Sequence, residues 1–153
     1  IMIEADVLVE FKSWNKIIQS PQRQISNILK KFPKRYKFIY KKVHLTVLLT
    51  NTNEIKILNK KFRKKNKPTD ILSFPFFDKT YLNKKINNKK LYLGDIVISY
   101  EDFLKKNKND YTNGFIKIFI HGFLHLLNFD HKTNKDYKKM NYIEKKIFQK
   151  VKG

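Results

Sequence analysis

The sequence contains no cysteine, and only four histidines, four glycines and four prolines stand among its 153 residues. The absence of cysteine excludes disulfides, a thiol nucleophile and every cysteine-ligated zinc site. A transition-metal site would therefore have to use histidine, aspartate or glutamate. No apolar stretch approaches the length needed to cross a bilayer, so we expect no membrane partner. The first residues, IMIEADVLVEF, lack a basic start and do not resemble a signal peptide, and we expect a cytoplasmic protein.

Acidic residues are also scarce, because 13 Asp and Glu stand against 34 Lys and Arg, which gives a formal net charge of +21. A field this positive attracts polyanions, of which nucleic acid is the commonest. All but three of the basic residues are lysines, and Asn, Ile, Phe and Tyr are abundant too. An AT-rich coding sequence would give the same composition, so the charge alone leaves both origins open.

The length suits one compact domain spanning 1–153 with a single core. Alternating apolar residues predict strands, and apolar residues that recur every three to four positions predict helices. The predicted strands are 7–11, 43–50, 70–77 and 91–99. The predicted helices are 20–32, 51–64, 114–128 and 134–151. Residues 78–90 are polar and rich in Lys and Asn, so a mobile loop is predicted there.

Several residues mark the ends and faces of these elements. Ser20 is predicted to cap the first helix, and Pro33 to end it. Asn51 and Glu54 have the spacing of a capping box at the start of the second helix. The residues of that helix predicted to face the core are Ile55, Leu58 and Phe62.

The strand predictions include two irregular positions. Pro75 cannot donate a ladder hydrogen bond, so the strand that contains it is predicted at a sheet edge. The apolar phase of the last strand slips at Gly94-Asp95, which predicts a β-bulge. The order of strands and helices indicates a mixed sheet covered by helices.

Three of the four histidines lie within eleven residues, in the stretch HGFLHLLNFDH. His121 and His125 are four apart on a predicted helix, so both imidazoles project from one face and can reach one ion. Asn128 suits the left-handed conformation that ends a helix, and the chain can then return His131 as a third ligand. The alternative, satisfied polar residues of a core helix, would bury two histidines without a shared partner.

Three neutral imidazoles on Zn²⁺ leave one coordination position open, where a bound water would have a pKa of about 7. The spacing also occurs in metzincin proteases, as H-E-x-x-H-x-x-G-x-x-H. Here the residue after the first histidine is Gly122, so the general base of peptide hydrolysis is missing. The chemistry therefore favours a substrate other than a peptide.

Two further polar residues have competing interpretations. Asp130 precedes the third candidate ligand, and could either accept a hydrogen bond from a ligand imidazole or cap the following helix. His44 stands alone on a predicted strand and points away from its apolar face, so we expect a structural histidine outside the site.

A basic cluster lies in the stretch KKFRKKNKPTDILSF, with six Lys or Arg residues between 60 and 67. A solvated helix face explains its lysines. Arg63 is the only arginine there, and a guanidinium binds phosphate bidentately and can stabilise charge that develops on it. A metal site together with an arginine is sufficient for cleaving a phosphodiester.

Three ordered stretches resemble the signatures of one family. HGFLHLLNFDH resembles the H-G-x-L-H-L-x-G-x-D-H signature of the bacterial YbeY endoribonucleases, the rRNA maturation factors. LNKKFRKKNKPTDILSFPF and YLGDIVIS resemble its two other stretches, and Met140 and Glu144 fit its C-terminal helix. The resemblance spans roughly residues 45–148. It departs from the signature at Asn128, where the family has Gly, and at Phe129, where Tyr is usual.

The resemblance implies a single-strand-specific, metal-dependent endoribonuclease that acts in 16S rRNA 3′-end maturation and ribosome quality control. It implies one Zn²⁺ per chain, with His121, His125 and His131 as ligands and Arg63 as the catalytic arginine. The implied partners are RNA and the small ribosomal subunit, with no nucleotide cofactor. Four lysines are expected to follow the RNA backbone. They are Lys60, Lys61, Lys64 and Lys65.

The expected fold class is α/β (α+β): a mixed four-stranded sheet covered by about five helices, one of them a zincin-like metal-binding helix. Two other functions stay open beside the nuclease. One is a non-catalytic ribosome-binding or RNA-binding assembly factor whose zinc is structural. The other is a metallopeptidase whose general base comes from elsewhere in the chain.

Overall fold

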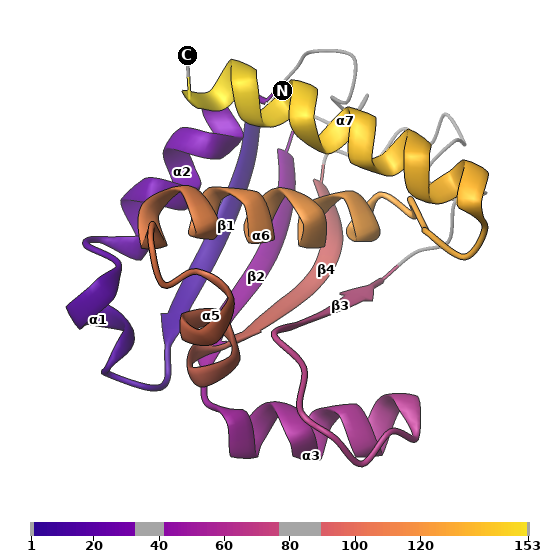
Figure 1. Cartoon of the computed structure of the whole chain (residues 1–153). Coiled ribbons are helices and arrows are strands. Elements are labelled where there is room, and N and C mark those ends of the chain that lie inside the picture. Colours follow the sequence, from indigo (N-terminus) through magenta and orange to yellow (C-terminus); the bar gives the residue numbers. More distant parts are fainter. Residues whose placement is uncertain (1, 33–41, 77–89, 153) are drawn as a thin grey trace.

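The chain alternates strands and helices around one sheet in the computed structural model, which describes residues 2–32, 42–76 and 90–152 (Figure 1). Within these ranges there are four strands and six helices. The strands are β1 (Met2–Val9), β2 (Lys42–Thr50), β3 (Ile71–Pro75) and β4 (Lys90–Ser99). The helices are α1 (Trp14–Ile17), α2 (Pro21–Lys31), α3 (Thr52–Arg63), α5 (Tyr100–Lys106), α6 (Tyr111–Leu126) and α7 (Asn134–Lys152).

The sheet has the strand order β1-β2-β4-β3 and is mixed. β1 pairs with β2 and β2 with β4 in parallel, whereas β3 runs antiparallel to β4 at the edge. The edge position predicted from Pro75 is therefore confirmed. The predicted bulge is present as well, because His44 is level with Tyr92 and Leu45 with Gly94, which leaves Leu93 as the extra residue. Gly94 has φ +142°, and a Cβ there would collide with the carbonyl oxygen of Phe74.

Helices cover the two faces of the sheet unequally. One face carries the main core, and α2 and α6 pack on it with α7 lying back along α6 (Figure 1). The opposite face is covered by α3 at the β3–β4 end, through a small cluster of Ile55, Leu72 and Val97. The edge strand β3 therefore stands between α6 on one side and α3 on the other. The α+β class, the mixed four-stranded sheet and the central buried helix agree with the sequence prediction.

Several local predictions differ from the structure. Ser20 has φ 50° and its side chain makes no capping hydrogen bond, because a left-handed residue cannot turn its hydroxyl toward the first amides as an extended N-cap does. Phe62 was predicted in the core, but 58% of it is exposed, because α3 covers only one end of the sheet. β1 begins at Met2 rather than at residue 7, since the whole segment pairs with β2. Helices α1 and α5 were not predicted, and both are short.

Other predictions hold or fall outside the described ranges. Asn51 caps α3, where its side chain accepts a hydrogen bond from the Glu54 amide at 3.0 Å. α2 ends at Lys31, and Phe32 is extended, as the residue before a proline prefers. The predicted mobile loop, 78–90, lies outside the described residues except for Lys90, which begins β4. None of the helices in the described part of the chain has the length and apolar character required to cross a membrane.

Candidate metal centre

Helix α6 carries the first two histidines of the candidate site. Its other faces are buried against the sheet and the neighbouring helices, so its position is fixed by the core. His121 and His125 lie one turn apart on the remaining face, with their Nε2 atoms 3.2 Å from each other. The centroids of their rings are 4.7 Å apart, so the i, i+4 spacing brings the two imidazoles to one point as predicted.

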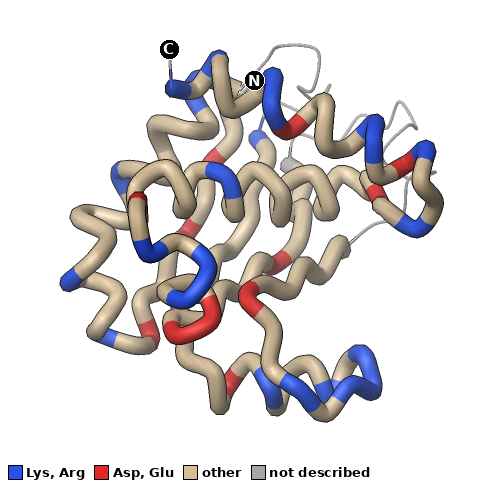
Figure 2. Tube along the Cα trace, viewed as in Figure 1, with Lys and Arg blue, Asp and Glu red and all other residues tan. Residues whose placement is uncertain are grey.

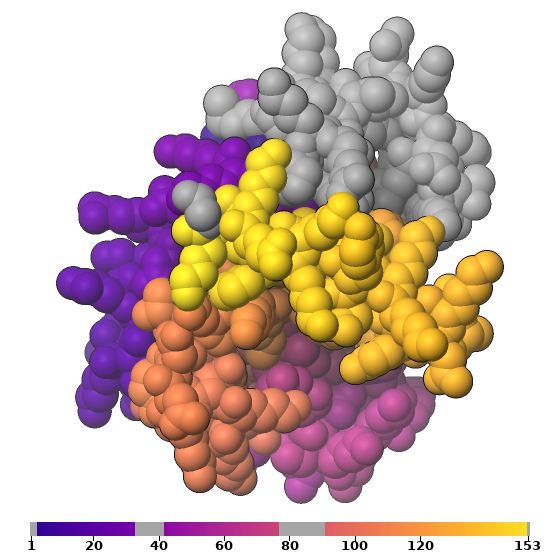
Figure 3. Space-filling model, turned by 45° about the horizontal axis from the view of Figure 1, so that its top comes forward, coloured from indigo at the N-terminus to yellow at the C-terminus, as the bar shows by residue number. Residues whose placement is uncertain are grey.

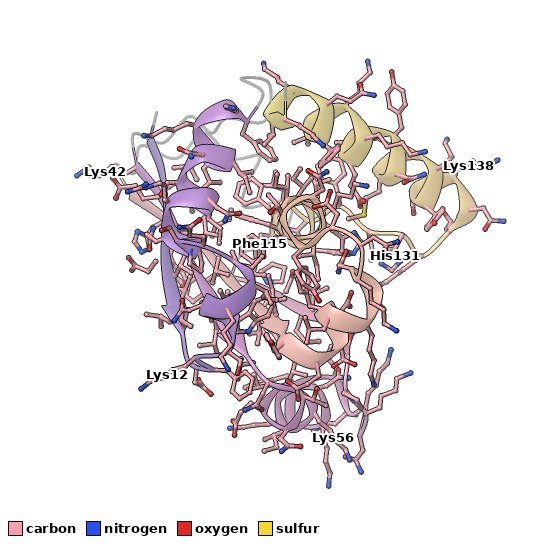
Figure 4. All side chains as sticks on the ribbon, turned by 60° about the vertical axis from the view of Figure 1, so that its left-hand side comes forward. Lys12, Lys42, Lys56, Phe115, His131 and Lys138 are labelled. Carbon is pink, nitrogen blue, oxygen red and sulfur yellow. The ribbon has the colours of Figure 1, made fainter. Side chains whose placement is uncertain are left out.

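The turn after α6 brings the third histidine to the same point. Asn128 has φ 68°, and its backbone N–H donates to the carbonyl of His125. The backbone N–H of Phe129 donates to the carbonyl of Leu124. This hydrogen-bond pair is the Schellman arrangement of a helix end, with Asn in the left-handed position that is usually Gly. His131 then lies with its ring centroid 5.7 Å from that of His121 and 5.1 Å from that of His125. In Figure 4, His131 lies beside the first turns of α7.

Among the described residues, the carboxylate that contacts a histidine ring of the cluster is not Asp130, which the sequence suggested, but one on α7. Glu144 on α7 lies with its Oε1 2.8 Å from Nδ1 of His121, an arrangement in which Nδ1–H donates and Nε2 faces the other two histidines. Asp130 takes neither role considered for it. Its carboxylate accepts the backbone N–H of His131 at 2.7 Å and pairs with Lys132 at 3.7 Å, whereas the Thr133 hydroxyl caps the start of α7.

Two pKa values at the site are shifted, that of His125 by burial and neighbouring imidazoles and that of Asp130 by a hydrogen bond. Burial lowers the pKa of His125 below its usual value, and the neighbouring His121 and His131 lower it further. The hydrogen bond from the His131 amide is the main cause that lowers the pKa of Asp130. His125 is thus kept neutral, which is the form of imidazole that binds a metal.

Gly122 and Ser73 fix the distance between α6 and the sheet. A Cβ at Gly122 would lie 2.7 Å from Cδ1 of Ile71 and 3.2 Å from the Ser73 hydroxyl. That hydroxyl donates to the Gly122 carbonyl at 3.0 Å and so joins β3 to α6. Position 122 therefore faces the sheet rather than the histidines. The sequence contained no sign of the Ser73 contact, because it depends on which face of β3 meets α6.

A cleft of about 640 Å³ runs from the histidine cluster across the edge of β3 to α3. Its lining includes all three histidines, Arg63 and Lys65, together with two cations that were not predicted, Lys67 and Lys132. The other three predicted lysines lie outside the lining. They are Lys60, Lys61 and Lys64.

Two segments are rich in cations: one ends at Arg63 and the other follows Lys132, and both of these residues line the cleft. Figure 2 shows Lys and Arg gathered at the C-terminal end of α3 and along α7. In the space-filling view, the golden first residues of α7 lie directly above the pink segment that contains α3 (Figure 3). Within the described residues, Arg63 forms no ion pair, so its guanidinium is available to an anion.

Asn59 is a cleft residue that the sequence analysis missed. It is 2% exposed, and its side-chain Nδ2 donates to the backbone carbonyl of Lys67 at 2.8 Å. The backbone carbonyl of Asn59 accepts from the backbone N–H of Lys65 at 3.3 Å. These contacts fold the segment after α3 back against the helix. The position follows Ile55 by four residues, so a polar residue on the apolar stripe was the sign that could have identified it.

His44 lies apart from the cluster, as predicted. It occupies the opposite face of the sheet, where its Nε2 is 2.8 Å from the Asp6 carboxylate and its ring stacks on Tyr92. Tyr92 in turn contacts Thr46 and Asp95, and its pKa is raised, mainly by burial and then by the hydrogen bond to Asp95. These contacts satisfy His44 without a metal.

The histidine cluster fits a metal ion by its donor set and its spacing. One nitrogen from each of the three histidines lies within 4.8 Å of the other two, so the three residues could hold one ion. Neutral imidazoles with a carboxylate on the outer nitrogen are typical of zinc sites. Within the described residues, no fourth His, Asp or Glu joins this group.

Comparisons with known proteins point to one family. The family model described as Endoribonuclease YbeY matches residues 8–152. A Pelagibacter ubique protein of that name is 53% identical over 99% of this chain and 97% of its own length. An Ehrlichia canis protein of the same name is 32% identical over 98% and 93%.

A solved structure has a similar fold. The solution structure of a Thermotoga maritima protein matches with a TM-score of 0.55 and 27% identity, covering 98% of this chain and 89% of that one. The family match extends over nearly the whole chain and includes the histidine cluster and the cleft. The chain therefore belongs to the Endoribonuclease YbeY family.

Proposed function

We propose that this protein is a metal-dependent endoribonuclease that cleaves single-stranded RNA and acts in the cytoplasm in 16S rRNA 3′-end maturation and ribosome quality control. The name that its relatives share supports RNA as the substrate. The net charge of +21 supports a polyanionic substrate as well. The proposal includes zinc as the cofactor and the small ribosomal subunit as a partner. It treats residues 1–153 as one domain.

One observation carries the proposal: three histidines whose nitrogens could hold one ion line the same cleft as Arg63, which forms no ion pair with the described residues. In this assignment His121, His125 and His131 bind the ion, and Glu144 orients the ring of His121. Arg63 donates two N–H groups to the two non-bridging oxygens of the scissile phosphate and stabilises the charge that develops on them. Lys65 binds the neighbouring RNA backbone within the cleft. The other three predicted lysines act from outside it: Lys60, Lys61 and Lys64.

A zinc ion held there would supply Lewis-acid stabilisation of the phosphate and lower the pKa of a bound water. In this proposal the phosphate lies between the histidines and Arg63. Both water and the RNA 2′-hydroxyl are compatible nucleophiles. A 2′,3′-cyclic phosphate on the product would identify the 2′-hydroxyl.

The two alternatives fit the site less well. A structural zinc normally has four protein ligands, whereas the group in the described residues contains three histidines. An open position suits a reacting phosphate better than a purely structural ion. A metallopeptidase needs a general base, but position 122 faces Ile71 and Ser73, and Glu144 is already engaged with His121.

The test is cleavage of a single-stranded 3′ precursor of 16S rRNA by the wild type and by Arg63→Ala, at equal metal content. We expect Arg63→Ala to lose about 10²–10³-fold in cleavage rate and to keep its metal. Arg23→Ala is the matched control, because Arg23 is exposed on α2 and lies outside the cleft. Equal cleavage by all three proteins would remove Arg63 from the mechanism, and no cleavage by the wild type would favour the ribosome-binding alternative.

A further inference from the structure

Two aromatic side chains form an exposed surface at the α3 end of the cleft. Phe62 is 58% exposed, and its ring packs edge-to-face on that of Phe74 at a centroid distance of 5.4 Å. Both residues line the cleft beside Arg63. A single exposed phenylalanine is ordinary on a protein surface, but an aromatic pair in a cleft that Arg63, Lys65 and Lys67 also line is not.

Phe74 packs on the core of the sheet and supports the pair, while Phe62 remains exposed to solvent. Along β3, Ile71 and Ser73 face α6, so Leu72 and Phe74 face the α3 side of the sheet. Leu72 is buried, and Phe74 packs on the same cluster as a half-buried residue. Phe62 lies on the last turn of α3, immediately before the chain turns away at Lys64, whose φ is 60°. The Phe62 ring is thereby held by Phe74, and most of it stays exposed although the Lys61 ammonium lies over it.

Cations surround the pair in the pattern that a nucleotide requires. The ammonium of Lys61 lies 5.3 Å from the centroid of the Phe62 ring. Arg63, Lys65 and Lys67 line the adjoining cleft. A nucleotide presents a flat base and a phosphate a few ångströms apart, and sites for single strands combine aromatic rings with such cations. The bases of a duplex are stacked internally and cannot use the rings.

A second exposed aromatic pair, on the same face of the sheet, does not meet these conditions. Phe76 is 65% exposed and contacts Tyr92 edge-on at 5.7 Å. Tyr92, however, is hydrogen-bonded to Asp95, and Asp6 lies on the neighbouring His44. These carboxylates repel phosphate, whereas the two aspartates that line the cleft, Asp70 and Asp130, are each paired with a lysine. The Phe62–Phe74 end is therefore the more favourable surface.

We propose that Phe62 and Phe74 form a base-stacking subsite for single-stranded RNA, which binds a nucleotide flanking the phosphate held at Arg63. The subsite rests on the proposed function in that RNA is the ligand of the cleft. It gives the enzyme a physical reason to prefer single strands, because only an unpaired base reaches the rings. The RNA then passes over the edge of β3, from the α6 side to the α3 side.

The experiment measures binding of a short unstructured RNA, labelled with a fluorophore, to the metal-loaded protein by fluorescence anisotropy. A gel of each sample checks that the strand is intact. The variants are Phe62→Ala, Phe62→Trp and Ile57→Ala. Ile57 is the matched control, because it lies on the same helix, is also 58% exposed and does not line the cleft. A second RNA has the same length and charge but abasic sugars at every position.

We expect Phe62→Ala to weaken binding of the normal RNA about tenfold, and Phe62→Trp and Ile57→Ala to bind like the wild type. On the abasic RNA, Phe62→Ala and the wild type should bind equally. Equal binding of the normal RNA by Phe62→Ala and the wild type would overturn the subsite and favour a protein contact at this surface. An equal loss on both RNAs would also overturn it, since stacking needs a base.

Cleavage assays on the same samples separate the subsite from the proposed function. Base-dependent binding through Phe62 without any cleavage by the wild type would keep the subsite and remove the nuclease. Cleavage by the wild type with no effect of Phe62→Ala on binding would keep the nuclease and remove the subsite.

Discussion

The two walls of the cleft are built in different ways. The α6 wall is fixed by the core: Gly122 lies against the sheet, Ser73 bonds to its carbonyl, and Glu144 holds His121. The α3 wall rests on the sheet through a small cluster and presents exposed side chains, among them Arg63 and Phe62. Groups that need exact spacing therefore lie on the rigid wall, whereas groups that follow a flexible polyanion lie on the solvated wall.

The largest contrast is between the histidines of the rigid wall and the histidine outside the cleft. His125→Ala should lower zinc affinity by more than about 100-fold and abolish RNA cleavage, because it removes one of three ligands. His44→Ala is the matched control and should leave both unchanged, since His44 lies on the other face of the sheet beside Asp6. Metal content by mass spectrometry and cleavage on a gel measure this. Zinc retained by His125→Ala at wild-type affinity would disprove the ligand assignment.

The second contrast is between the two carboxylates near the cluster. Glu144→Gln should lower zinc affinity about 10- to 100-fold, because the carboxylate that orients His121 is lost. Asp130→Asn should change the affinity far less, since its carboxylate contacts the His131 amide and Lys132. Titration against a zinc-binding dye measures both. A larger loss of affinity in Asp130→Asn than in Glu144→Gln would indicate that Asp130 is the carboxylate that orients a ligand imidazole.

The third contrast concerns the close approach of α6 to the sheet. Gly122→Ala should lower the free energy of unfolding by about 1–3 kcal/mol, because its Cβ would meet Ile71 and Ser73 and push the helix outward. Lys117→Ala, at an exposed position of the same helix, should change it little. Denaturant unfolding followed by circular dichroism measures the difference. Equal stability of the two variants would show that α6 and the sheet can move apart to accommodate the added Cβ without loss of stability.

The smallest expected effect comes from the lysines of the solvated wall. Lys65→Ala should weaken RNA binding a few-fold and reduce the slope of log affinity against log salt by about 0.7, because one phosphate contact is lost. Lys56→Ala should keep the wild-type slope, since Lys56 lies on α3 and outside the cleft. Anisotropy titrations at several salt concentrations measure the slopes. Identical slopes for both variants would attribute the attraction to net charge alone.

The histidine cluster of the rigid wall was predictable from sequence because its geometry is local. A four-residue spacing on a helix places His121 beside His125 whatever the rest of the fold, and a left-handed Asn128 is a property of a short turn. The exclusion of His44 followed equally simply from strand alternation. The mixed sheet and the edge position of β3 followed from the order of elements and from Pro75.

The remaining features depend on tertiary contacts that no local pattern contains. Phe62 fits the apolar stripe of α3, but whether that stripe is covered depends on how far the helix extends over the sheet. Asn59 breaks the stripe and is nevertheless buried, because a loop eight residues later needs its amide. Glu144 was noted in the family resemblance without a role, since its contact to His121 spans two helices.

The turn at Asn128 has a consequence for how metal binding relates to folding. The spacing of His121 and His125 comes from a helix, and the return of His131 comes from two backbone hydrogen bonds that close its end. Little chain ordering is therefore left for the ion to impose, in contrast to zinc fingers, where binding and folding are one process. The ion should act on this protein as a ligand of a native state that already exists, and its affinity should reflect coordination rather than folding.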